Sequence, residues 1–291
     1  MRRRTAKAQS AMEYLMTYGW AILIIAVVLG ALFQLGVFNA GAFAPRAPPG
    51  ACQVFRPNGP NTASLVNLEG VCSGELPQYV GVFNGQTGYI NAGNQPVLQV
   101  QYLAASAWVN TNSIANWPDV VDQYNSCLTG WALRVSNAGS GYPEYVVNIG
   151  NSEYGIDSNL KIPLNSWVNL VETWNGVAVT GYMNGQLVAG PANPTFSGSI
   201  SSTQSVLIGE GCGGYLSGSI ANVQIYNTSL TSPEVNALYA EGIGGAPIKL
   251  SNLVSWWPLN GNANDYSGNN NNGVPSAVTY TNQWSSGYTA P

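Results

Sequence analysis

Residues 167–189 read WVNLVETWNGVAVTGYMNGQLVA, and this stretch decides the fold. Two Asn-Gly pairs divide it into short apolar runs, and Asn-Gly is a strong signal for a tight hairpin turn. Trp167, Leu170 and Trp174 are interspersed with polar residues, as expected of a strand that places one face in a core. The stretch therefore predicts consecutive antiparallel strands joined by Asn-Gly turns.

Similar short runs continue on both sides of this stretch. The chain contains 34 Gly and 17 Pro, only 8% of it is charged, and such a composition favours short strands with many turns. After residue 52 we predict a helix only at 232–241, with Ser232 as its N-cap. The predicted fold class is mainly β: a long apolar N-terminal helix followed by a two-sheet antiparallel β-sandwich with one short helix. The predicted strands are 79–83, 88–91, 98–109, 131–135, 145–149, 167–174, 178–183, 206–208 and 220–226.

The order of these runs resembles a known family, the laminin G-like, concanavalin A-like jelly rolls. The resemblance covers residues 79–242 and implies a jelly roll, with a whole domain at 52–291. The segments that carry it are YVGVFNGQTGYI (79–90), AASAWVN (104–110), GWALRVSN (130–137), IPLNSWVNLVETWNGVAVTGYMNGQLVA (162–189) and LSGSIANVQIYNTSLTSPEVNALY (216–239).

The C-terminal segment departs from the family pattern. LVSWWPLNGNANDYSGNNNNG (253–273) resembles the strand and loop that open such a domain, yet here it comes last. Either 250–291 supplies the missing first strand, as in a circular permutation or by donation to a neighbouring subunit, or a truncated second domain begins there. The first interpretation is favoured because so few residues cannot form a second core.

The N-terminal sequence indicates that the chain is exported. Residues 1–7 carry four basic side chains, and no residue from Tyr14 to Phe38 is charged. At 1.5 Å per residue this stretch is long enough to cross a hydrocarbon core of about 30 Å. The basic end should stay cytoplasmic, which places the rest of the chain at the cell surface. Residues 39–51, rich in Pro, Gly and Ala, are a spacer.

The leader also resembles one particular class. RRRTAKA followed by QSAMEYLMTYGWAILIIAVVLG resembles the class III signal peptides of archaeal type IV pilin-like proteins. The resemblance implies that a prepilin peptidase removes residues 1–8 between Ala8 and Gln9, and that 9–38 forms a helix that leaves the membrane for a filament of pilin subunits. It also implies an assembly role for Glu13. A plain N-terminal membrane anchor is the alternative.

Several function classes are excluded by composition. The absence of His removes the usual general base and the commonest metal ligand. Without the leader, five basic residues remain against thirteen acidic ones, so no basic face is available for nucleic acid. A glycosidase of this fold often carries an ExDxxE-like run, which is missing here. We therefore expect no enzymatic activity.

A calcium site is the one cofactor that the sequence suggests. Laminin G-like domains often hold Ca²⁺, which prefers oxygen ligands. The loop at 260–273 offers Asp265 and Asn260, and Asp119 with Asp122 is a second candidate pair. The alternative for Asp265 is an Asx turn that caps nearby amides.

Cysteine usage and one sequon complete the candidate sites. Asn227 begins the sequon Asn-Thr-Ser, a possible glycosylation site or a local cap. Four cysteines fit an oxidising compartment, and their pairing remains open among three connectivities. The suggested pairs are Cys52 with Cys72, and Cys127 with Cys212, loops that the family fold would bring together.

Three hypotheses about function follow. The first is a cell-surface filament subunit that displays a laminin G-like domain for adhesion, with a carbohydrate as the expected ligand. The second is a membrane-anchored carbohydrate-binding protein outside any filament. The third and weakest is a cell-surface glycoside hydrolase.

Overall fold

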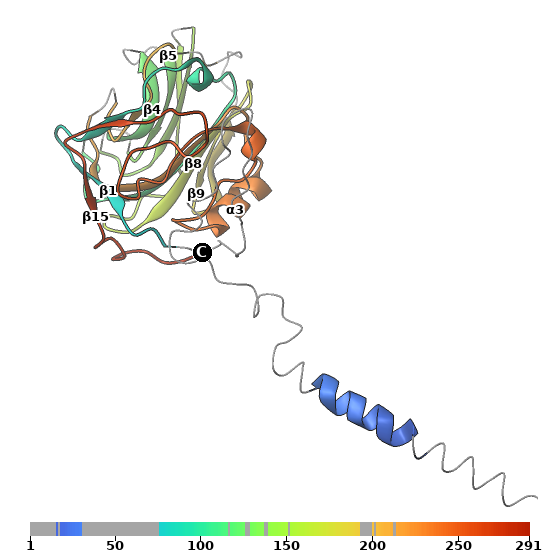
Figure 1. The fold of residues 1–291 in the computed structure, drawn as a ribbon. Coiled ribbons are helices and arrows are strands. Elements are labelled where there is room, and N and C mark those ends of the chain that lie inside the picture. Colours follow the sequence, from blue (N-terminus) through green and yellow to red (C-terminus); the bar gives the residue numbers. More distant parts are fainter. Residues whose placement is uncertain are drawn as a thin grey trace, which may run out of the picture. The chain divides into compact units, whose positions relative to one another are not determined.

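The structure is a computed structural model that divides into two compact units, which we treat separately. The first unit contains an N-terminal helix and the second contains the β-sandwich (Figure 1). The described residues are 16, 18–30, 76–115, 117–125, 129–136, 139–150, 152–192, 200, 202–211 and 214–291.

The N-terminal helix covers residues 18–30, drawn in blue in Figure 1. Its apolar side chains are exposed, among them Trp20 and Ile24. The described part is shorter than the predicted helix at 9–38, and the described residues include no helix with the length and apolarity needed to cross a membrane. The predicted processing and assembly residues Ala8, Gln9 and Glu13 lie outside the described residues.

The second unit contains two antiparallel sheets, which confirms the predicted mainly β sandwich. The strand orders are β10-β9-β8-β3-β12-β1-β15, with β13 also on β12, and β14-β2-β11-β4-β5-β6-β7. The eight-stranded sheet contains β1 (Val80–Asn84), β3 (Leu103–Thr111), β8 (Val168–Trp174), β9 (Val179–Met183), β10 (Gln186–Ala192), β12 (Ser217–Tyr226), β13 (Leu253–Trp257) and β15 (Thr279–Thr281). The seven-stranded sheet contains β2 (Tyr89–Asn91), β4 (Asp119–Asn125), β5 (Thr129–Arg134), β6 (Glu144–Ile149), β7 (Ser152–Asp157), β11 (Leu207–Ile208) and β14 (Val274–Ser276).

Each strand in the predicted ranges is present, and β10 follows the second Asn-Gly turn, although no range was given for it. The strands β4, β7, β14 and β15 were not predicted. The sequences of β4 (DVVDQYN) and β7 (SEYGID) are largely polar and lack the apolar run used to find strands. β10 and β14 each contain a proline and lie at sheet edges, where a missing N–H costs no ladder bond. The strand predicted at 98–109 starts only at Leu103, because Pro96–Leu98 forms the 3₁₀ helix η3.

The short helix α3 (Ser232–Ala240) is confirmed, but its predicted N-cap is wrong. Thr231 is the N-cap, with extended backbone angles, and Ser232 is the first helical residue. Glu234 Oε2 accepts hydrogen bonds from the Thr231 N–H at 2.8 Å and from its hydroxyl at 2.9 Å. Pro233 can follow at once, because the first helical N–H groups have no intrahelical partner.

The core lies between the two sheets. Trp131 on β5, Trp174 on β8 and Trp257 on β13 are its largest fully buried side chains. Trp167, predicted for the same core, belongs instead to a separate cluster with Trp108 and Trp284. Its Nε1–H donates to the Trp284 carbonyl at 2.8 Å, which fixes the C-terminal tail to the start of β8.

The segment after residue 250 adds strands to both sheets. It begins with the 3₁₀ helix η4 (Leu250–Asn252) and continues as β13, which pairs with β12, then β14 with β2 and β15 with β1. Since β3 occupies one edge of β12 along its length, β1 and β13 share the other edge end to end. In this structure the C-terminal segment thus pairs with strands of its own chain.

Candidate functional site

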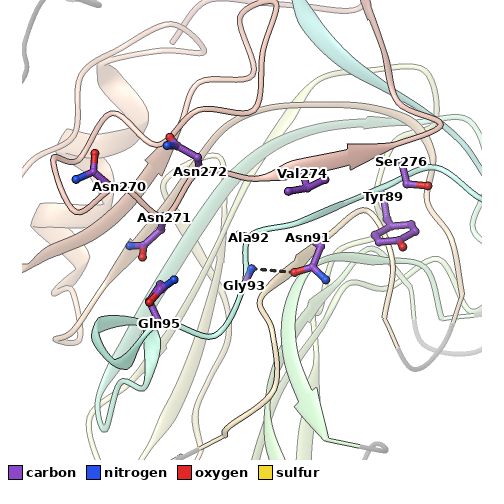
Figure 2. Close-up of a pocket in the computed structure, with 10 residues that line it drawn as sticks. All are labelled: Tyr89, Asn91, Ala92, Gly93, Gln95, Asn270, Asn271, Asn272, Val274 and Ser276. Atoms are coloured by element: carbon purple, nitrogen blue, oxygen red, sulfur yellow. Dashed lines mark hydrogen bonds between the residues drawn. The ribbon is translucent and has the colours of Figure 1, made fainter.

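A groove lies on the outer face of the seven-stranded sheet, at its β14 edge (Figure 2). Tyr89 and Asn91 on β2 point outward because Ile90 between them is fully buried in the core. Val274 pairs with Asn91 and Ser276 with Tyr89, so these β14 residues share the outward face. The groove has a volume of about 440 Å³ and is lined by Tyr89, Asn91, Ala92, Gly93, Gln95, Asn270, Asn271, Asn272, Val274 and Ser276.

The Asn-rich loop at one side of the groove is held in place by Asp265. Asp265 Oδ1 accepts the N–H groups of Trp256 and Ser267, and Oδ2 accepts the Asn271 N–H, each at 2.9 Å. The Ser267 hydroxyl also donates to Oδ2 at 2.9 Å. The Asn272 side chain accepts the N–H of Asp265. The loop is thereby fixed against β13, and Asn270 and Asn272 remain exposed at the rim.

The chemistry of the groove is polar and uncharged. Its side chains supply amide groups, the Ser276 hydroxyl and the phenol of Tyr89, and none of its ten lining residues is ionised at neutral pH. Amides offer both donors and acceptors, which suits ligands rich in hydroxyl groups. The Tyr89 ring lies 6.5 Å from the Tyr215 ring, at an interplanar angle of 50°. A concave polar site bordered by aromatic rings can bind and orient a ligand.

Asn271 gives the groove wall an unused acceptor. Its Nδ2 group donates to the Val254 carbonyl at 3.2 Å and to the Ser255 hydroxyl at 2.8 Å. The backbone carbonyl of Asn271 accepts the Trp257 Nε1–H at 2.8 Å. Its Oδ1 is buried and accepts no hydrogen bond from the described residues. In Figure 2 the Asn271 amide points toward the side of the groove that carries Gln95. A buried acceptor of this kind calls for a donor from water or a ligand.

A buried charged cluster occupies the same outer face further along the sheet. A register shift between Asp119 and Val121 places Asp119 and Asp122 on one side of β4. Arg134 Nε donates to Asp119 Oδ1 at 2.9 Å, and its Nη1 donates to Glu144 Oε2 at 3.0 Å. A Cβ added at Gly211 would collide with Oδ2 of both aspartates, so the two carboxylates converge beneath this glycine.

Burial controls the ionisation of this cluster. It raises the pKa of the Glu144 carboxyl above its usual range, although the neighbouring Arg134 guanidinium opposes the rise. Burial also raises the pKa of the Tyr124 phenol, whose ring lies 5.2 Å from the Arg134 guanidinium carbon. The cluster is thus held together by internal ion pairing around one arginine.

The calcium candidates are separated into different environments. Asp265 accepts hydrogen bonds from three donors of its own loop, as the Asx-turn alternative predicted, and from the Trp256 N–H of β13. Asn260 Oδ1 accepts the Tyr79 N–H at 2.7 Å. Asp119 and Asp122 do come together, but with Arg134 beside them. The described residues contain no group of three or more acidic or cysteine side chains arranged to hold a metal. Calcium binding stays a prediction.

The remaining predicted sites are the sequon at Asn227 and the four cysteines. Asn227 is exposed directly after β12, and its Oδ1 accepts a hydrogen bond from Asn252 Nδ2 at 3.0 Å. Glycosylation there stays a prediction. The predicted disulfide cysteines, Cys52, Cys72, Cys127 and Cys212, lie outside the described residues.

Sequence reasoning missed most of the groove. Tyr89, Asn91 and Gln95 were not singled out, and Asn270 to Asn272 were considered only as part of a calcium loop. The alternation Tyr-Ile-Asn in β2 could have indicated that Tyr89 and Asn91 face away from the core. No local signal indicates that β14, far along the chain, pairs with β2.

A sequence model of one family matches residues 84–236, from the end of β1 into α3. The chain belongs to the concanavalin A-like lectin/glucanases superfamily. This membership confirms the jelly-roll resemblance, and the strands β13 to β15 lie beyond the matched residues. No curated protein matches the chain.

The chain is similar to solved structures at low sequence identity. One is a candidate carbohydrate-binding protein from Bacteroides ovatus, with a TM-score of 0.56 and 17% identity over 70% of this chain. This chain spans 60% of that protein's length. A heptameric SAP-like pentraxin from Limulus polyphemus matches with a TM-score of 0.49 and 17% identity, over 70% of this chain and 94% of the pentraxin. At these identities the first likeness establishes the fold, and the second adds no functional argument.

Proposed function

We propose that this chain is a non-enzymatic carbohydrate-binding protein of the cell surface and that the groove between β2 and β14 is its binding site. The observation that carries the proposal is the combination, in one concave site, of amide side chains with the ring of Tyr89. Membership of a superfamily named for lectins supports it. The B. ovatus protein of the same fold, described as a candidate carbohydrate-binding protein, is consistent with this function.

The test is a glycan array probed with the full chain in detergent, followed by calorimetric titration of the tightest glycan. Tyr89→Ala removes the ring that would stack on a sugar face, and we expect the affinity to fall about tenfold or more. Tyr102→Ala is the matched control, because Tyr102 is a 48% exposed tyrosine that does not line the groove. Equal affinity of Tyr89→Ala and the unchanged protein would exclude the groove as the site.

The absence of catalysis is part of the proposal. A histidine base is missing from the whole chain, and the groove itself carries no carboxyl group. The converging Asp119 and Asp122 are buried beside an arginine that pairs with Asp119. We expect no reducing ends to be released from any bound glycan over prolonged incubation. Release that disappears in Asp122→Asn would instead favour the hydrolase hypothesis.

The place of the protein on the cell rests on its N-terminal sequence. The leader, the Ala8–Gln9 junction and Glu13 support a pilin-like subunit that a prepilin peptidase processes and that joins other subunits in a filament. Mass spectrometry of isolated surface filaments should then find this chain with Gln9 as its first residue. A mature N-terminus at Met1 would support the alternative of a plain membrane anchor.

A further inference from the structure

One buried polar atom of the groove wall, an acceptor, has no partner among the described residues. Asn271 is only 1% exposed, and its Oδ1 accepts no hydrogen bond from the described residues, although its Nδ2 donates twice. Because this oxygen has almost no accessible surface, a sugar in the groove would reach it only through a bridging water, which a sugar hydroxyl can hold. A carboxylate or sulfate group has no hydrogen to donate at neutral pH and would face the acceptor lone pairs.

Cations near the groove are the second consideration. The described residues include Arg134, Lys161 and Lys249 as cations, and none of them lines the groove. Arg134 pairs with Asp119 and Glu144, Lys249 pairs with Glu234 at 2.9 Å, and Lys161 lies over the Tyr142 ring. The described groove therefore provides no positive side chain to compensate an anionic ligand.

Asp265 is an acidic residue near the groove, although it does not line it. It lies behind the Asn-rich loop, where its N–H donates to Asn272 Oδ1.

We propose that the groove selects uncharged glycans and rejects glycans that carry carboxylate or sulfate groups. The inference rests on the proposed carbohydrate-binding function and deepens it by naming the ligand class. An anion entering the groove would lose hydration without gaining a cation among the described residues, and it would be repelled by the nearby Asp265 carboxylate. A neutral sugar meets amides that can donate or accept, and a water bridged to one of its hydroxyls can donate to Asn271 Oδ1.

The test compares glycans in matched pairs that differ only in charge. The full chain is probed with lactose and sialyllactose, with unsulfated and sulfated galactose oligomers, and with methyl-esterified and free uronic acid oligomers, alongside a broad neutral array. We expect every anionic member to bind at least tenfold more weakly than its neutral partner, or not at all, and at least one neutral glycan to bind. Equal or tighter binding of an anionic member would overturn the inference but leave the carbohydrate-binding function standing. Absence of binding to every glycan would overturn both.

A charge substitution tests whether the groove itself makes the selection. Val274 is 69% exposed on the edge strand and lines the groove, so Val274→Lys should fold normally and add one cation. We expect affinity for anionic members to rise severalfold at low salt, with the gain lost at high salt. Val177→Lys is the control, because Val177 is 55% exposed in the turn between β8 and β9 and does not line the groove. A similar change in both variants, or in neither, would contradict selection by this groove.

Discussion

The outer faces of the two sheets differ in how their polar positions are used. On the eight-stranded sheet, α3 packs through Leu238 over a cluster that includes Tyr226 and Trp256. The polar groups beneath it are uncharged: Asn222 Oδ1 accepts hydrogen bonds from Trp256 Nε1 at 2.7 Å and from Gln224 Nε2 at 2.9 Å. On the seven-stranded sheet, the outward positions carry a buried ion cluster and the groove.

The difference shows how one alternating pattern produces two surfaces. Where a helix supplies an apolar covering, the outward residues are aromatic or form a satisfied neutral network, and that face is used for stability. Where outward residues are amides and charges, the sheet keeps groups that can contact a ligand. Substitutions on each of the two faces test this division.

Arg134→Met should have the largest effect, because it leaves Asp119 and Glu144 buried without their cation. Breaking a buried ion pair in this way costs about 3–5 kcal/mol of the free energy of unfolding, measured by urea denaturation. The triple variant Arg134→Met, Asp119→Asn, Glu144→Gln removes the uncompensated charges and should recover most of that loss. A single variant as stable as the unchanged protein would show that the cluster does not hold this face together.

Leu238→Ala tests the apolar covering of the other face. Leu238 is 3% exposed on α3, and truncating a buried leucine costs about 2–5 kcal/mol. Leu250→Ala is the control, since Leu250 is 42% exposed, and it should change stability by less than about 0.5 kcal/mol. Both effects are read from denaturant unfolding of the full chain. Equal losses in the two variants would mean that α3 does not act as a packed cover.

Thr231→Ala should cost about 1 kcal/mol, because it removes the N-cap hydroxyl of α3. The Thr231 N–H lowers the pKa of Glu234, so the stability that Glu234 adds is present above the ordinary glutamate pKa and is lost as the pH falls through the lowered value. Thermal unfolding of Thr231→Ala and Thr231→Ser measures the effect. If Thr231→Ser loses as much stability as Thr231→Ala, the loss comes from the threonine methyl group and not from the hydroxyl.

Glu172→Gln should change how the free energy of unfolding depends on pH. Glu172 on β8 is fully buried and shares the inward side of the strand with Leu170 and Trp174. Burial raises its pKa well above the usual range, with Arg134 opposing the rise. The stability linked to its protonated form is complete below the ordinary glutamate pKa and is lost as the pH rises through the raised value. As the pH rises from acidic to neutral, the unchanged protein should therefore lose free energy of unfolding that the variant keeps. The difference between the two should grow in favour of the variant. Free energies that change in parallel with pH would contradict this.

Particular residues show how far sequence reasoning reached. The turn at Asn184 and Gly185 could be predicted because Asn and Gly are among the few residue types that readily adopt positive φ. In the structure their φ angles are 51° and 74°. The strand β4 could not be predicted from periodicity, because its register shift breaks the alternation of apolar and polar residues that marks a strand. That same shift brings Asp119 and Asp122 to one side, where an unbroken strand would alternate them.

The turns, most strands, the helix α3 and the family could be predicted from the sequence, because they depend on backbone preferences and patterns within a few residues. The pairing of β14 with β2, the packing of Trp167 on Trp284 and the ion pairs of Arg134 with Asp119 and Glu144 were visible only in the folded chain. Such contacts join residues far apart in the chain or on neighbouring strands, and they depend on packing and pairing that no local pattern encodes. The groove belongs to this second group, since its two walls come from opposite ends of the sandwich sequence.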